Sequence, residues 1–154
     1  MYFDNQQISP PETVTAINEK IVAADGDSFA IGARKFRLKG IDAPEYNQTC
    51  KGEDGKDWPC GRSAKAALET ILTQPGLTCS VEYHDRFARS LAKCRTTAIP
   101  DIGGAQVSNG MAISDDFHGL RSYGDEEDTA SIAKRGIWQG SFIDPKLWRQ
   151  THSR

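Results

Sequence analysis

Three carboxylates and one guanidinium are gathered in a short part of the sequence with the pattern of strand, turn and strand. Asp27 lies in the turn at residues 25–28, and Arg37, Asp42 and Glu45 follow soon after it. Turns and strand ends are places where a scaffold can aim carboxylates at one point. Carboxylate oxygens suit a hard divalent cation, and a nearby arginine can hold an anion. We therefore expect an oxygen-rich cation site with an anion-binding group beside it.

The elements that must position these residues follow from the apolar pattern and the turn residues. Asp25-Gly26 is typical of a tight turn, and Pro44 stops the strand that precedes it. Apolar residues at helical spacing predict a helix over 61–73, which Pro75-Gly76 ends. Strands are expected at 14–24, 28–31 and 34–41, and a polar loop follows at 46–60. After the helix we expect a hairpin at 77–84 and 89–96, a short helix that opens at 99–104 and runs to 111, a loop at 114–124 and a last helix at 125–135. Strands followed by late helices indicate the α+β class.

Three sequence blocks, in order, resemble the staphylococcal-nuclease-like (thermonuclease) family. They are DGDS at 25–28 with FRLKGIDAPE at 36–45, DRFARSLA at 85–92, and Glu126 or Glu127 followed by AKRGIW at 133–138. Together the blocks span roughly residues 18–140, which makes the ordered set more specific than any one of them. The resemblance implies a five-stranded OB-like β-barrel with three α-helices. It also implies one domain over 13–154, after a flexible leader at 1–12.

The resemblance assigns a metal site to two aspartates and one backbone carbonyl. Asp27 and Asp42 match the family's metal-binding aspartates, and the carbonyl of Ala43 would supply a third oxygen. So few protein ligands imply weak affinity for one Ca²⁺ ion, suited to the millimolar calcium found outside cells.

The resemblance assigns the chemistry to one further carboxylate and two arginines. Glu45 matches the carboxylate that activates or orients the attacking water, and Arg37 and Arg89 match the two arginines that grip the phosphate. Bidentate guanidinium geometry would make lysine a poor replacement for either. The implied activity is calcium-dependent hydrolysis of DNA and RNA phosphodiesters with little sequence preference.

Each of these residues also has a purely structural interpretation. Asp27 suits a turn, Arg37 could lie over the sheet edge, and Asp42 could open an Asx-type turn. Arg89 could pair with Asp85 across the hairpin. These alternatives stay open at the level of sequence.

Several features argue against tight nucleic-acid binding. The 154 residues carry a net charge of −2 and the pI is near 5.9, whereas nonspecific affinity rests on Lys and Arg that neutralise phosphates. The acids at 115–116 and 125–128 also stand where some members of the family have tyrosines or basic residues along the nucleotide. The expected partner is therefore DNA or RNA bound weakly and transiently by a monomer. The alternative is a catalytically weak or inactive accessory module of an extracytoplasmic pathway, such as one linked to exopolysaccharide production.

Four cysteines lie at 50, 60, 79 and 94. Their spacing suits no zinc module. One interpretation is that all four are unrelated buried thiols. A hairpin centred on Arg86-Phe87 would place Cys79 opposite Cys94, at a separation that a disulfide spans. Cys50 and Cys60 then bracket the polar loop, and each bridge would stabilise the fold by roughly 3 kcal/mol.

Disulfides imply an oxidising compartment, so we expect a periplasmic or secreted protein. The chain as given shows no signal peptide and no apolar run long enough for a membrane span.

Overall fold

A six-stranded sheet forms the body of the protein. The computed structural model describes residues 6–117 and 120–152. The strand order is β1-β8-β9-β4-β3-β2, and all neighbours are antiparallel except β4 and β9. The strands are β1 (Gln6–Thr15), β2 (Ile21–Ala23), β3 (Ser28–Ile31), β4 (Arg34–Leu38), β8 (Thr78–His84) and β9 (Ser90–Arg95). The parallel pairing sets Arg37 beside Leu91, so two blocks distant in the sequence lie on adjacent strands.

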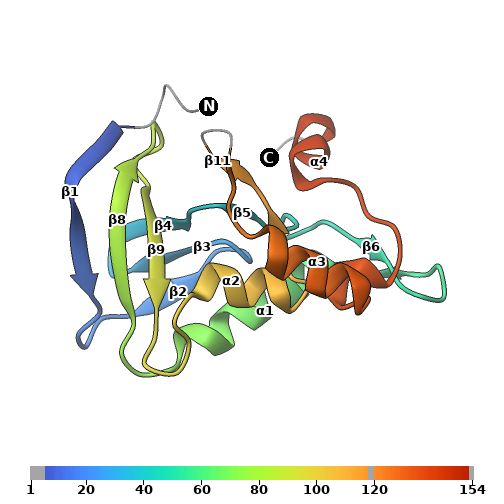
Figure 1. The fold of residues 1–154 in the computed structure, drawn as a ribbon, viewed down its shortest axis with the longest axis horizontal. Coiled ribbons are helices and arrows are strands. Elements are labelled where there is room, and N and C mark those ends of the chain that lie inside the picture. The colour runs from blue at the N-terminus through green and yellow to red at the C-terminus, as the bar shows by residue number, and fades with distance from the viewer. Residues whose placement is uncertain (1–5, 118–119, 153–154) are drawn as a thin grey trace.

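Helices and short strand pairs surround this sheet. In Figure 1 the helices α1, α2 and α3 lie together in the lower half of the view, and α4 stands apart at the upper right. The helices are α1 (Cys60–Leu72), α2 (Ile102–Ser108), α3 (Gly124–Ile132), the 3₁₀ helix η2 (Gly136–Gln139) and α4 (Pro145–Thr151). The short pairs are β5 (Ile41–Asp42) with β10 (Ile113–Ser114), β6 (Cys50–Lys51) with β7 (Asp57–Trp58), and β11 (Asp116–Phe117) with β12 (Leu120–Arg121).

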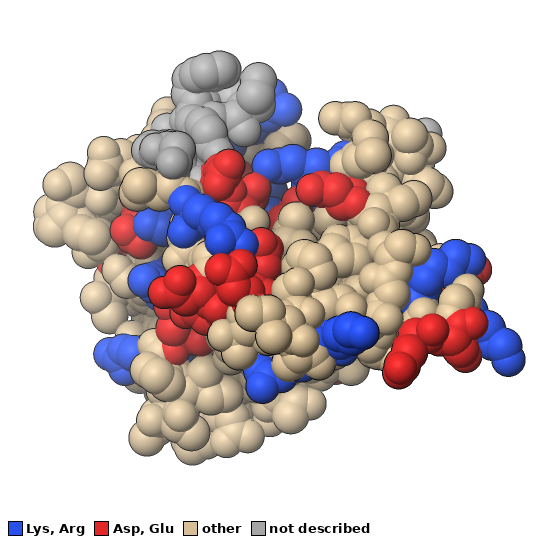
Figure 2. All heavy atoms as spheres, turned by 45° about the vertical axis from the view of Figure 1, so that its right-hand side comes forward, with Lys and Arg blue, Asp and Glu red and all other residues tan. Residues whose placement is uncertain are grey.

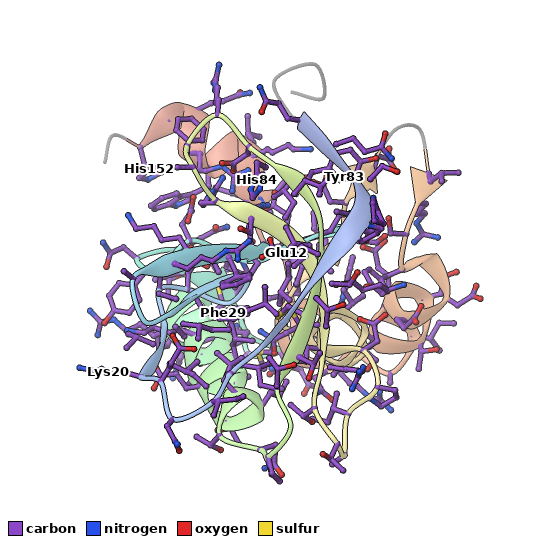
Figure 3. All side chains as sticks on the ribbon, turned by 90° about the vertical axis from the view of Figure 1, so that its left-hand side faces the viewer. Glu12, Lys20, Phe29, Tyr83, His84 and His152 are labelled. Atoms are coloured by element: carbon purple, nitrogen blue, oxygen red, sulfur yellow. A yellow bond between two sulfur atoms is a disulfide. The ribbon has the colours of Figure 1, made fainter. Side chains whose placement is uncertain are left out.

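The core lies between the sheet and the helices. The rings of Phe29 and Phe36 stack with centroids 5.4 Å apart, and Figure 3 shows Phe29 among the enclosed side chains. Leu68 from α1 and Ile102 from α2 are fully buried against them. Burying an apolar side chain of this size stabilises by roughly 1.5–3 kcal/mol, which holds the helices on the sheet.

The α+β class predicted from the sequence is confirmed, with differences in detail. The five expected strands correspond to β2, β3, β4, β9 and β8, and β1 adds a sixth at the β8 edge. The predicted strand at 14–24 is wrong as one element, because the chain turns at Asn18, which has φ 53°, and divides into β1 and β2. From Gln6 on, the segment predicted as a leader forms part of β1 and pairs with β8. The pairing satisfies backbone groups at the edge of β8. Residues 1–5 lie outside the described part.

Other predicted elements change length or divide. Gly40, with φ 84°, breaks the predicted strand at 34–41 into β4 and β5. The predicted loop at 46–60 contains the hairpin β6–β7, and the helices predicted to reach 111 and 135 end at Ser108 and Ile132. A fourth helix, α4, follows the three that were expected. Its seven residues include only Leu147 and Trp148 as large apolar side chains, too few to form a periodic pattern in the sequence.

Both predicted disulfides are formed. Cys79 and Cys94 are direct cross-strand partners, with Cα atoms 4.1 Å apart. Cys50 and Cys60 close the loop before α1 and pack with Ile137 in a small second core. The hairpin register shifts between Val81 and Tyr83, so the tight two-residue turn expected at Arg86-Phe87 is wrong: a bulge lengthens the connection.

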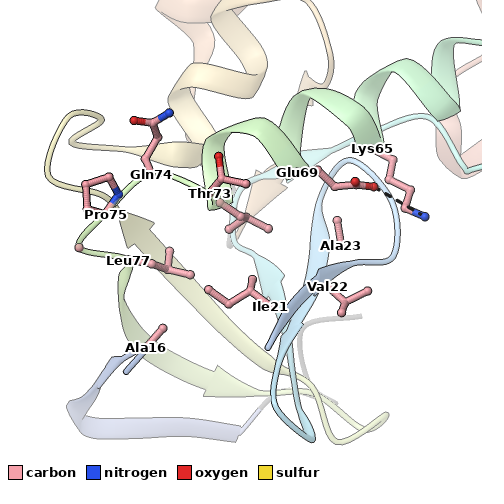
Figure 4. Close-up of a pocket in the computed structure, with 12 residues that line it drawn as sticks. Ala16, Ile21, Val22, Ala23, Lys65, Glu69, Thr73, Gln74, Pro75 and Leu77 are labelled. Atoms are coloured by element: carbon pink, nitrogen blue, oxygen red, sulfur yellow. Dashed lines mark ion pairs between the residues drawn. The ribbon is translucent and has the colours of Figure 1, made fainter. Parts of the chain in front are cut away.

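No helix in the described ranges is both long and apolar enough to cross a membrane. A cavity of about 670 Å³ lies between α1, β2 and the connection into β8. Figure 4 shows it lined by Ile21, Val22 and Leu77, with the Lys65–Glu69 ion pair at its rim. The predicted site residues do not line this cavity.

Candidate active site

The turn between β2 and β3 fixes Asp27 pointing inward. One carboxylate oxygen of Asp25 accepts hydrogen bonds from the backbone N–H of Asp27 at 3.1 Å and from the Ser28 hydroxyl at 2.7 Å. Gly26 lets α1 approach closely, since a Cβ there would lie 2.6 Å from the Ala64 Cβ. The Asp27 residue is only 2% exposed as a result.

The segment after β4 brings a second carboxylate against the first. Asp42 ends β5 and is 1% exposed. The next backbone N–H, that of Ala43, donates to Oδ2 of Asp27 at 2.8 Å. This hydrogen bond locks the Asp42-Ala43 backbone onto the Asp27 turn, so the two predicted metal-binding aspartates are neighbours.

Arg37 joins the two aspartates. Its Nη1 lies 3.2 Å from Oδ1 of Asp27, and its Nη2 lies 3.5 Å from Oδ1 of Asp42. Nη2 also donates to the Ile41 carbonyl at 3.3 Å. Burial alone would lower the pKa of this guanidinium, but Asp27 and Asp42 raise it above its usual value. Arg37 is therefore permanently charged and stabilises both carboxylates.

The anionic charge in this pocket exceeds what Arg37 neutralises. Burial raises the pKa of Asp27 well above its usual value; Asp25 and Asp42 raise it further, and Arg37 opposes the shift. Burial also opposes ionisation of Asp25, yet its hydrogen bonds from Asp27 and Ser28 leave its pKa below the usual value. A carboxylate with a raised pKa next to further carboxylates is a site where an added cation is stabilising.

Glu45 is held beside this pair by its backbone. Its N–H donates to Oε1 of Gln48 at 3.1 Å, and its carbonyl accepts from the Gln48 N–H at 2.8 Å. Gly61 packs so closely that a Cβ there would collide with the Glu45 carbonyl. The Glu45 side chain is 11% exposed, against 3% for Asp27 and 1% for Asp42.

Arg149, which sequence reasoning missed, completes the cluster from α4. Its Nη1 and Nη2 lie 3.0 and 3.1 Å from the two oxygens of Asp42, and Nη1 lies 3.4 Å from Oε1 of Glu45. Burial alone would lower the pKa of Arg149, but these carboxylates raise it. Arg149 is 107 positions from Asp42 and belongs to no motif, so nothing in the sequence marks it.

Arg89 occupies the hairpin between β8 and β9. Its Nε donates to Oδ2 of Asp85 at 2.8 Å, and its guanidinium lies over the Phe87 ring at 5.6 Å. Ala88 has φ 61°, a conformation that favours glycine. Arg89 therefore pairs with Asp85, as its purely structural interpretation predicted. Arg37, in contrast, contacts Asp27 and Asp42 directly.

The donor atoms suit a hard cation, although the described residues hold no group of three or more His, Cys, Asp or Glu side chains placed to hold a metal. The expected ligands are only two carboxylates, Asp27 and Asp42, plus the Ala43 carbonyl. All are oxygens, and a cation beside Asp27 would oppose the burial that raises its pKa. In this conformation the guanidinium of Arg149 supplies that charge to Asp42.

The surface near the site mixes both signs of charge. Figure 2 shows acidic and basic side chains side by side on one face, without a continuous basic surface. Next to Glu45, the ring of Tyr46 is flanked by Arg62 at 5.4 Å and Lys65 at 5.0 Å. Such a basic and aromatic cluster can contact a phosphodiester strand, since bases stack on rings and phosphates pair with cations.

This fold and cluster define a nuclease-like α+β domain. Residues 35–140 match the family described as staphylococcal nuclease homologue, and the chain belongs to that family. The chain is also similar to the "Succinoglycan biosynthesis protein ExoI" of Rhizobium meliloti (strain 1021), with 30% identity over 116 residues. The match covers 75% of this chain and 61% of the relative, so the chain spans less than two thirds of that protein's length.

Proposed function

We propose that this chain is a calcium-dependent nuclease that cleaves DNA and RNA phosphodiesters with little sequence preference. The observation that carries the proposal is the contact of Arg37 with both Asp27 and Asp42, beside the backbone-anchored Glu45. Membership of the staphylococcal nuclease homologue family supports the same activity.

The residues would divide the work as follows. Asp27, Asp42 and the Ala43 carbonyl would hold one Ca²⁺ ion, which when bound would neutralise charge on a phosphoryl oxygen. Glu45 would take a proton from the attacking water, because its side chain is more exposed than those of Asp27 and Asp42. Arg37 would orient the phosphate and stabilise the charge that develops on it.

Arg89 would act as the second phosphate-gripping arginine. For this, its guanidinium must exchange Asp85 for the substrate phosphate. The exchange is feasible because the side chain is 27% exposed and is held by a single carboxylate. A bidentate contact with phosphate would replace the ion pair with Asp85.

The compartment and the substrate affinity follow from chemistry. The two disulfides are stable only where conditions are oxidising, so a periplasmic or secreted location is proposed. Calcium at millimolar concentration outside cells suits a site with few protein ligands. The net charge of −2 implies a weak and transient complex with nucleic acid.

Degradation of single-stranded DNA tests the proposal. The protein should degrade single-stranded DNA in the presence of calcium and lose this activity when a chelator is added. Glu45→Gln should lower the rate of degradation by roughly 10²–10⁴-fold. Glu53→Gln, at an exposed position of the β6–β7 loop, is the matched control and should keep full activity. Equal clearing in chelator, or an active Glu45→Gln variant, would contradict the mechanism.

A second candidate function is an accessory module in exopolysaccharide production. The name of the Rhizobium meliloti relative favours it, as does the pairing of Arg149 with the two carboxylates that the nuclease mechanism needs. This candidate would be favoured if the wild type and Arg149→Gln both fold but neither degrades DNA in the presence of calcium.

A further inference from the structure

Arg149 contacts the side chains that the proposed function assigns to the metal ion and to the base. Its two terminal nitrogens engage both oxygens of Asp42, and one of them lies near Glu45. The Asp42 side chain is only 1% exposed, and its Oδ1 also lies 3.5 Å from Nη2 of Arg37, so guanidinium groups cover both of its oxygens. The guanidinium of Arg149 therefore provides the positive charge that a calcium ion would otherwise bring to Asp42.

The helix that carries Arg149 is held mostly by polar contacts. Pro145 is its only buried residue, and Leu147 is 52% exposed. Besides Arg149, the segment is anchored by an ion pair from Lys146 to Asp115 at 2.8 Å. Because α4 buries little apolar surface, its docking depends on the charge of the carboxylates beneath it.

A buried glutamine connects this segment to the predicted base. Gln48 is 1% exposed; its Oε1 accepts from the Glu45 N–H, and its Nε2 donates to the Ile143 carbonyl at 2.7 Å. The start of α4 is thus anchored on the same loop that positions Glu45. Movement of α4 can pivot about this anchor without freeing the helix from the domain.

We propose that Arg149 is an internal counter-cation that competes with calcium for Asp42, so that binding of the ion requires α4 to leave the site. This inference rests on the proposed function, because it takes Asp42 as a calcium ligand. Arg149 takes both oxygens of Asp42, so an ion that needs one of them competes with it. The competition is reciprocal: calcium weakens docking of α4, and docking weakens binding of calcium. α4 then sets the calcium concentration at which the site becomes competent.

Calcium binding measured by isothermal titration calorimetry tests the competition directly. We expect Arg149→Gln to bind calcium more tightly than the wild type, by roughly 5- to 150-fold, the usual range for coupled sites. The matched control is Arg135→Gln, which removes an exposed arginine that donates to the Ser108 carbonyl; its calcium affinity should equal that of the wild type.

The melting temperature provides a second measurement that does not depend on activity. Without calcium, Arg149→Gln should melt below the wild type, because the buried Asp42 loses a counter-charge. Saturating calcium should raise the melting temperature of this variant more than that of the wild type, since a ligand that binds only the folded state stabilises according to its affinity.

The fluorescence of Trp148 reports on α4 in the unaltered site. The indole stacks on His152 with centroids 3.9 Å apart. Calcium should change the tryptophan emission of the wild type, and Trp148→Phe should abolish that change. An emission that stays constant at saturating calcium would overturn the release of α4.

Two further outcomes separate this inference from the proposed function. Equal calcium affinity in the wild type and in Arg149→Gln, with DNA still cleaved, would overturn the competition and leave the nuclease assignment intact. Absence of calcium binding in both proteins would overturn the competition and the calcium requirement together.

Discussion

The site has a strand-borne part and a peripheral part, and the two are built differently. Asp27, Arg37 and Asp42 lie at the ends of paired strands and contact one another; both aspartates are buried, and the Arg37 side chain is 20% exposed. Arg89 and Arg149 come from a hairpin tip and a short terminal helix. Figures 1 and 3 place the β8–β9 tip and α4 at the same end of the molecule.

Arginine has a different role in each part. Arg37 bridges two buried carboxylates, so its position is inseparable from the stability of the fold. Arg89 and Arg149 each pair with a buried carboxylate, but their own side chains are each 27% exposed, so water or another anion can replace these contacts from the solvent side. The strand-borne part is suited to a fixed geometry, and the peripheral part to exchange of partners.

The largest expected effect is that of Arg37→Gln, which should disrupt both stability and activity. Leaving Asp27 and Asp42 buried without this counter-charge should cost about 3–5 kcal/mol in the free energy of unfolding. Urea unfolding measures this loss, and DNA cleavage should fall by at least about 10²-fold. Arg34→Gln on the same strand removes a partly exposed pair with Glu12 and should cost less than about 1 kcal/mol. Similar losses in both variants would contradict the distinction between the two parts.

Arg89→Gln should separate activity from stability. Cleavage should fall by roughly 10²–10³-fold, as when one donor to a developing anion is removed. The free energy of unfolding should fall less than in Arg37→Gln, because the Asp85 carboxylate still accepts from the backbone N–H groups of Phe87 and Arg89. Single-turnover cleavage and urea unfolding measure the two quantities. Arg95→Gln, at an exposed position at the end of β9, is the matched control. Unchanged cleavage in Arg89→Gln would restrict Arg89 to its pairing with Asp85.

Asp27→Asn should change how stability depends on pH in the absence of calcium. The pKa of Asp27 is raised in the folded state, so its contribution to stability is present below the usual value of 3.8 and is lost as the pH rises through the folded value. The stability of the variant should therefore rise relative to that of the wild type as the pH rises from 4 to 8. Urea unfolding in chelator at several pH values checks the trend. A difference that is constant with pH would show that Asp27 stays ionised throughout.

The smallest expected effect is a gain in stability from Ala88→Gly. Ala88 has φ 61°, where an L-residue costs roughly 1–2 kcal/mol relative to the right-handed region and glycine costs little. The variant should be more stable by about 0.5–1 kcal/mol in urea unfolding, with the hairpin and Arg89 in place. A loss of stability would show that glycine loosens the turn more than it relieves the backbone.

Much of the fold and part of the candidate site were predictable because they depend on contacts that sequence spacing determines. The cross-strand position of Cys79 and Cys94 follows from counting residues about a hairpin, and the count holds on the Cys79 side of the bulge. The helix at 61–73 follows from apolar spacing and forms as α1. The proximity of Asp27 to Arg37 follows from two adjacent strands, β3 and β4, that pair through a short turn.

Other features depend on the path of the chain through space, which no local pattern records. The strand at Gln6–Thr15 forms because the β8 edge is available to pair with it, although its own sequence contains two prolines. The φ of 61° at Ala88 results from a hairpin that lengthens around a bulge.

The sequence by itself determined the family, the sheet that carries Asp27, Arg37 and Asp42, and the partners of the cysteines, because each depends on residues within one turn, hairpin or ordered motif. Only the tertiary structure decided that Arg149 lies on Asp42 and Glu45. That contact joins segments 107 positions apart through charge alone. Charged residues are common along the chain, so a pairing of this kind appears only when the backbone has brought the two side chains together.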